Sequence, residues 1–284
     1  MPIHNFIAPM IAGSSAKVVP VTLAQLFSDI GVTAELILDA GDASSYGGSG
    51  QTWSDVSGAG NHFYLGSGSG ADGADPTFNG SSGDLGSYWT FDGGDYFSLV
   101  AGSNPAAFET LHKNNAALDM GALFKMPASA VGSLGLFTTR SSANDVGAQF
   151  NSEYWGSDNY RHNFFVKNGT GNAFAASPSS GEADDQWLYY GVHIDEATGA
   201  GGGFYVLNTG YKQVGGSDTF DATYTSPSAS SASGKALIGA FQTSSPPTIQ
   251  PAGAALACLF LNTGTLMTAD QHFAIAENLL ARFA

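Results

Sequence analysis

Positive charge is scarce in this sequence. Its 284 residues include 9 lysines and arginines against 24 aspartates and glutamates, which gives a net charge of −15 at pH 7. Nucleic acids and anionic membranes attract proteins through a positive field, so the charge balance argues against both as partners. Charged residues of either sign make up only 12% of the chain, about half the usual share. Salt bridges therefore cannot be the main source of stability.

Cysteine and long apolar runs are also nearly absent. Cys258 is the single cysteine, so no disulfide framework exists, and its strand-like setting in 254–261 predicts a buried thiol. No apolar run reaches the roughly 18 residues of a transmembrane helix, and the N-terminus lacks the pattern of a secretory signal. A chain suited to a harsh exterior yet made without an export signal fits a virion component produced in a host cytoplasm. It also fits an ordinary cytosolic protein.

Turn residues and apolar residues are plentiful. The chain has 38 glycines and 11 prolines, with 43% hydrophobic residues, which predicts many turns around a substantial core. Short strand patterns run from 34 to about 261, the clearest at 187–195, and no helical pattern separates them. This arrangement predicts an all-β fold, a two-sheet antiparallel jelly-roll sandwich at 34–284.

Both ends of the chain differ from this β region. Prolines interrupt residues 1–33 before a short helical pattern that begins near Thr22 and ends at Gly31. We interpret 1–33 as an N-terminal arm or docking segment; the alternative is a helix packed on the main domain. The segment 268–283 opens with a Thr-x-x-Gln capping box and predicts a closing helix that covers the sheet.

Catalytic and metal-binding motifs are largely missing. The sequence contains no Walker A, HExxH, CxxC or GxSxG pattern, and no helix follows the GxGxxG match at 68–73. The six histidines are scattered, so a histidine-rich metal site is not expected, and His193 in its strand predicts a structural or surface role. Glu35 and Asp39 are a possible carboxylate pair for glycoside hydrolysis, but no sugar cleft is indicated around them.

Acidic loop residues favour calcium as a possible cofactor, because calcium takes several oxygen ligands from loops. The alternative is that these aspartates stabilise Asx turns beside glycines. The candidate ligands are Asp39, Asp42, Asp55, Asp92 and Asp95, with Asp72 and Asp75 in a further loop.

Aromatic residues near polar loops point to carbohydrate binding. Sugars bind against exposed aromatic faces while carboxylates and amides hydrogen-bond their hydroxyls, and 151–160 is the best candidate stretch. The alternative is that these aromatics pack in the core. The candidate ligand-binding residues are Glu153, Tyr154, Trp155, Asp158, Asn159 and Tyr160.

Several motifs, taken in order, resemble one family. They are LDAGD at 38–42 with WSDVSGAGN at 53–61, WTFDGGDYF at 89–97, the strands 187–195 and 204–208, LIGA at 237–240 and LMTADQ at 266–271. Together they resemble the concanavalin A-like (laminin-G-like) domains of phage virion and bacterial surface proteins, over about 34–284. The resemblance implies a two-sheet jelly roll, a fold that lectins, glucanases and packing modules share. The Glu-x-Asp-x-Glu strand of the glucanases is absent.

We therefore expect a non-enzymatic phage virion structural protein, such as a head decoration or fibre protein or a tail adhesin. Its lectin-like domain would attach to glycans or a host surface, residues 1–33 would contact other virion proteins, and the chain would form a homo-oligomer. The alternatives are a free carbohydrate-binding module and a glycoside hydrolase.

Overall fold

The structure is a computed structural model. It describes residues 18–284, except 128–131, 157–158, 177–178, 181–184, 197, 199–200, 209–217 and 241–250. Residues 1–17, which make up half of the predicted arm, are thus outside the described part.

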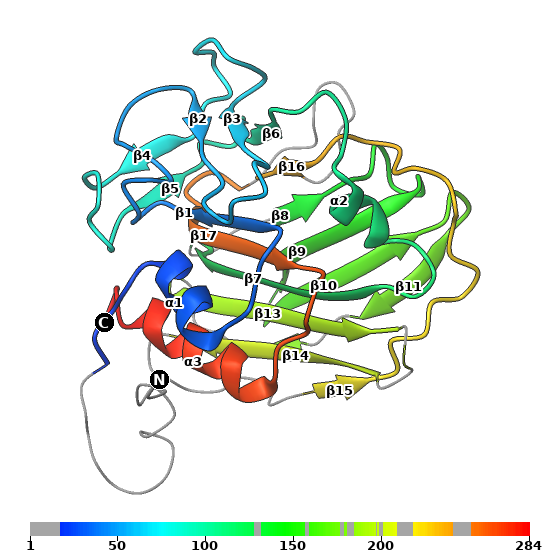
Figure 1. The fold of residues 1–284 in the computed structure, drawn as a ribbon. Coiled ribbons are helices and arrows are strands. Elements are labelled where there is room, and N and C mark those ends of the chain that lie inside the picture. Colours follow the sequence, from blue (N-terminus) through cyan, green and yellow to red (C-terminus); the bar gives the residue numbers. More distant parts are fainter. Residues whose placement is uncertain are drawn as a thin grey trace, which may run out of the picture.

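Two antiparallel sheets form the domain (Figure 1), which confirms the predicted sandwich. Sheet A has the order β15 (Asp218–Phe220), β14 (Gly201–Asn208), β13 (Trp187–Asp195), β7 (Ala117–Lys125), β17 (Ala255–Asn262), β5 (Tyr88–Thr90) and β4 (Thr77–Asn79), and β1 (Leu36–Asp39) also pairs with β17. Sheet B has the order β11 (Asn172–Ala176), β10 (Asn159–Lys167), β9 (Gly147–Gly156), β8 (Ser133–Thr138), β16 (Leu237–Ile238), β6 (Phe97–Leu99), β3 (Phe63–Leu65) and β2 (Thr52–Trp53), and β12 (Ser179–Ser180) also pairs with β10.

The main core lies between the two sheets. Period-two alternation directs one set of side chains from each strand into it, such as Met120 and Phe124 from β7 and Phe150 from β9. The rings of Trp89 and Phe97 meet edge to face with centroids 5.2 Å apart. Burial of these large aromatic side chains supplies much of the stabilising energy in a chain that has few charges.

A second apolar layer covers the other face of sheet A. The helices α1 (Leu23–Ile30) and α3 (Ala269–Leu280) lie side by side across it, while the short α2 (Ala106–Thr110) lies elsewhere (Figure 1). Phe27 of α1 meets Phe260 of β17 at a centroid distance of 5.0 Å. The helix predicted within the arm is therefore packed on the sandwich.

The helix ends follow the sequence signals. Thr268 accepts a hydrogen bond from the backbone of Gln271, whose side chain bonds back to Thr268, so the predicted capping box is present. Gly31 ends α1 with a φ of 70°, a left-handed conformation that costs glycine little.

Among the described residues, none of the helices combines the length and the apolar character of a membrane span. Cys258 is buried as predicted, and burial raises the pKa of its thiol to about 12.

Candidate functional site

The outward face of β9 and β10 carries an unusual row of amide side chains. Because Phe150 and Phe164 point into the core, alternation places Gln149, Asn151 and Asn163 on the opposite face. Asn151 and Asn163 are partners across the two strands. We call these three residues the amide row. Strands that present aromatics on one face and amides on the other are suited to holding a polar ligand.

The residues of the amide row are buried, and only some of their polar atoms have hydrogen-bond partners. Its three side chains are 1–2% exposed, whereas Glu153 beside them is half-buried. Asn163 Nδ2 donates to Glu153 Oε2 at 3.0 Å. Gln149 Oε1 and Asn151 Oδ1 have no hydrogen-bond partner among the described residues. Buried amide oxygens are nearly always paired in proteins, so these two are unsatisfied acceptors, which a ligand donor could reach only if the side chains around them moved aside.

Positive charge gathers at one end of the row. Lys167 ends β10, and its Nζ lies 5.9 Å from the centroid of the Phe165 ring. Burial and the nearby charge of Arg140 lower the pKa of Lys167. Arg140 is itself buried, which lowers its pKa to about 10, so it stays charged at neutral pH. The Asp145 carboxylate near Arg140 offsets part of this charge, but in a chain of net charge −15 the two cations still favour an anionic group at this end.

The predicted ligand residues fall on the same two strands. Glu153 faces outward beside the amide row, as described above. Tyr154 and Trp155 belong to β9, Asn159 and Tyr160 to β10, and Asp158 is outside the described residues. Because β9 and β10 pair along their length, these backbone positions adjoin the row.

The residues that the sequence reasoning missed are Gln149 and Asn163. On β9 the available signal was the pair of amides two positions apart, at Gln149 and Asn151. Asn163 is the one amide in 161–166, a segment that by itself predicts only a strand.

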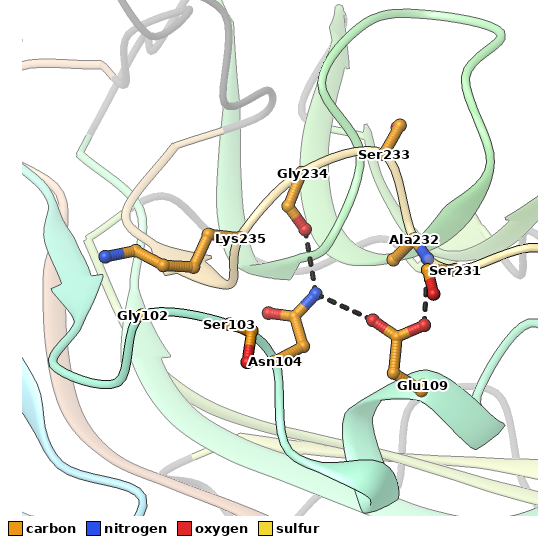
Figure 2. Close-up of a pocket in the computed structure, with 9 residues that line it drawn as sticks. All are labelled: Gly102, Ser103, Asn104, Glu109, Ser231, Ala232, Ser233, Gly234 and Lys235. Atoms are coloured by element: carbon orange, nitrogen blue, oxygen red, sulfur yellow. Dashed lines mark hydrogen bonds between the residues drawn. The ribbon is translucent and has the colours of Figure 1, made fainter.

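A pocket of about 360 Å³ lies between the loop after β6, α2 and the loop before β16 (Figure 2). Asn104 and Glu109 converge in it: Asn104 Nδ2 donates to Glu109 Oε1 at 3.1 Å and to the carbonyl of Gly234 at 2.9 Å. Glu109 Oε2 accepts from the backbone of Ala232 at 2.9 Å. The Lys235 side chain extends away from this group in Figure 2. Because Asn104 and Glu109 are used to hold the loop, the pocket is better explained by loop anchoring than by ligand binding.

Two of the predicted calcium ligands are engaged by protein donors. Asp39 accepts from Arg282 at 2.8 and 3.0 Å and from the backbone of Leu23 at 2.8 Å. Asp55 accepts from the backbone of Ile37 and of Asn61, each at 2.9 Å. A cation would have to displace these donors. The ion pair of Asp39 likewise argues against its use with Glu35 as a glycosidase pair.

The remaining predicted ligands sit in turns. Asp42 Oδ1 accepts from the backbone of Ser44 at 2.8 Å, which is the Asx turn of the alternative interpretation. Asp92 and Asp95 are close together: the Asp92 N–H donates to Asp95 Oδ2 at 2.8 Å. Burial and the neighbouring carboxylates raise the pKa of Asp95 to about 6. Calcium binding at this pair stays a prediction.

A third polar group lies under α3, and no local motif predicts it. Asp119 of β7, His193 of β13 and His272 of α3 bring one ligand atom each within 4.8 Å of one another. The two histidines are far apart in sequence, and only the fold brings them beside the same carboxylate.

Comparisons with known proteins identify the fold. No family model and no curated protein matches the chain. Trypanosoma rangeli sialidase in complex with the inhibitor DANA is 13% identical, with a TM-score of 0.51 over 92% of this chain and 36% of that one. The structure titled "Cell entry of botulinum neurotoxin type C is dependent upon interaction with two ganglioside molecules" is 12% identical, with a TM-score of 0.55 over 89% and 53%.

The binding domain of botulinum neurotoxin serotype D is 9% identical, with a TM-score of 0.51 over 84% of this chain and 49% of that one. This chain thus spans about a third of the sialidase and about half of the toxin chains. The likeness establishes a lectin-like jelly-roll sandwich, and at such low identity it establishes the fold alone.

Proposed function

We propose that this chain is a non-enzymatic lectin-like domain that binds a glycan on the outward face of β9 and β10. The observation that carries the proposal is the amide row, with two buried amide oxygens that no described residue satisfies. Sugar hydroxyls are donors and acceptors that match amides and a carboxylate such as Glu153. A few convergent polar groups beside aromatic residues are typical of small-ligand sites.

The positive end of the row favours an acidic glycan. Lys167 and Arg140 lie where a carboxylate or sulfate on a sugar would gain charge-assisted contacts. The structural neighbours support this choice, since they include a sialidase in complex with sialic acid and a botulinum neurotoxin whose cell entry depends on interaction with ganglioside molecules. For this chain the ligand class rests on the two cations.

Binding to an array of neutral, sulfated and sialylated glycans tests the proposal. Asn151→Leu keeps the branched shape of asparagine but removes its acceptor, so we expect binding to weaken about tenfold, the value of one hydrogen bond. Because Asn151 Oδ1 makes no hydrogen bond, its loss should not lower the free energy of unfolding, and loss of the amide N–H groups should lower it by no more than about 1.5 kcal/mol. Lys167→Gln should weaken binding to acidic glycans only.

The matched control is Asn114→Leu, which makes the same change at an exposed position. Equal binding by Asn151→Leu and wild type would place the ligand elsewhere, and no binding to any glycan would remove the proposal. Incubation of each bound glycan with the protein also tests hydrolysis, because release of sugar would make the chain a glycosidase. We expect the glycan to be recovered unchanged. Glycoside hydrolysis needs two carboxyl groups, and the described residues of this face offer no second one beside Glu153.

We also propose that the domain is displayed on a phage virion as a homo-oligomer, with the region before α1 contacting other virion proteins. This part rests on the proline-interrupted start of the chain and on the family resemblance. Antibody-labelled electron microscopy of purified particles should show regular labelling. Recovery of the protein only from the particle-free fraction would refute it.

A further inference from the structure

Three ligand atoms converge beneath α3, from three different elements. Asp119 Oδ1 lies 2.8 Å from His193 Nδ1 and 3.0 Å from His272 Nε2. Asp119 and His193 are directly paired on β7 and β13, and His272 belongs to α3, the helix that lies against these strands (Figure 1). Two imidazole nitrogens and one carboxylate oxygen are a donor set that suits zinc better than calcium.

The surroundings hold Asp119 and His272 in place. Asp119 Oδ2 accepts from Asn262 Nδ2 at 3.0 Å and from the Met267 backbone at 2.8 Å. The Tyr189 hydroxyl lies 2.9 Å from His272 Nδ1. The outer atoms of Asp119 and His272 are thus committed to neighbours, while one ligand atom from each of the three residues lies within the shared group. Such outer contacts are what orient the ligands in protein metal sites.

We propose that Asp119, His193 and His272 bind a divalent transition-metal ion, with zinc as the best match. In a tetrahedral site with bonds of about 2.0–2.2 Å the ligand atoms are about 3.3 Å apart. The two separations from Asp119 Oδ1 need to open by only a few tenths of an ångström, and the two histidine nitrogens, which lie within 4.8 Å of each other, need to come to a similar distance. Three protein ligands leave a fourth position, and the His193 side chain, at 22% exposed, gives it access to solvent. The ion would fasten α3 to the middle of sheet A.

The competing arrangement is hydrogen bonding alone, with both ring nitrogens donating to Asp119 Oδ1. The two arrangements differ in what His193 must supply: a lone pair for the metal, but only an N–H for the hydrogen bond. Asparagine at position 193 can place an amide N–H near the position of Nδ1, yet an amide nitrogen does not ligate zinc. His193→Asn therefore separates the two.

The experiment is titration of the metal-stripped full chain with Zn²⁺ alone by isothermal calorimetry, repeated with Co²⁺ for its visible absorption. We expect one ion per chain and a rise in melting temperature when it binds. His193→Asn should weaken Zn²⁺ binding by more than about 100-fold, because changes in outer contacts alone cost about 10–100-fold. Tyr189→Phe, which keeps all three ligands, should weaken it by about 10-fold.

The control is His62→Asn, because His62 Nδ1 accepts from the Asp55 backbone at 3.0 Å and an amide oxygen can replace that acceptor. It should bind Zn²⁺ as wild type does. Failure of wild type to bind a stoichiometric ion, or equal binding by His193→Asn, would overturn the proposal. Loss of metal binding in His193→Asn with an unchanged circular-dichroism spectrum would support it. Glycan binding on sheet B is a separate measurement, so either proposal can fail alone.

Discussion

Arg282→Met is expected to lower the free energy of unfolding by about 3–5 kcal/mol, the usual cost of leaving one partner of a buried ion pair uncompensated. The Arg282 guanidinium binds both oxygens of Asp39 at 2.8 and 3.0 Å, and neither side chain is exposed. Burial alone would lower the pKa of Arg282, but the charge and hydrogen bonds of Asp39 outweigh it and raise this pKa. Urea unfolding followed by circular dichroism measures the loss.

The double variant Asp39→Asn with Arg282→Met is the control. The double variant also removes the negative charge of Asp39, which the single variant leaves buried without a partner. It should therefore recover a large part of the lost stability. Arg282 also donates to the Val21 carbonyl at 2.6 Å, and Asp39 accepts from the Leu23 backbone. The single variant should therefore speed hydrogen exchange in α1 more than elsewhere. A loss below about 1 kcal/mol in the free energy of unfolding would mean that the Asp39–Arg282 ion pair contributes little to holding α1 and the C-terminal segment on the sandwich.

This ion pair shows where sequence reasoning reached its limit. Asp39 precedes a loop rich in glycine and serine, and that local pattern suggested a calcium ligand. Its actual partner is 243 residues away, and no local pattern reports such a distance. The capping box at Thr268 was predicted correctly because both of its partners lie within one helical turn.

The residues of the candidate site also differ in whether a local sequence pattern could predict them. Glu153 was predicted from its polar and aromatic neighbours in the chain. Asn163 was missed because its meaning depends on pairing with Asn151 in the adjacent strand. The pairing of β13 with β7, and the position of α3 over them, were needed to unite His193 with Asp119 and His272. Alternation fixes which face a residue occupies, but only the strand order fixes its neighbours.

Stability should fall as the pH rises from about 4 to about 6, because of Asp95. Its side chain is 4% exposed, and burial together with Asp92 and Asp75 raises its pKa from 3.8 to about 6. Between these values the folded chain keeps a proton that the unfolded chain has released. Unfolding then becomes easier with increasing pH, by about 2–3 kcal/mol in total for a shift of roughly two units.

Asp95→Asn should remove this dependence. The amide oxygen can still accept from the Asp92 backbone, as the carboxylate does at 2.8 Å, but it carries no charge. The variant should match wild type near pH 4 and exceed it by about 2–3 kcal/mol at pH 8, as urea unfolding at both pH values would measure. Asp84→Asn is the control, since Asp84 is exposed and also accepts a backbone bond, from Gly86 at 3.0 Å. If the two variants gained equally at pH 8, the effect would come from reduced net charge rather than from the burial of Asp95.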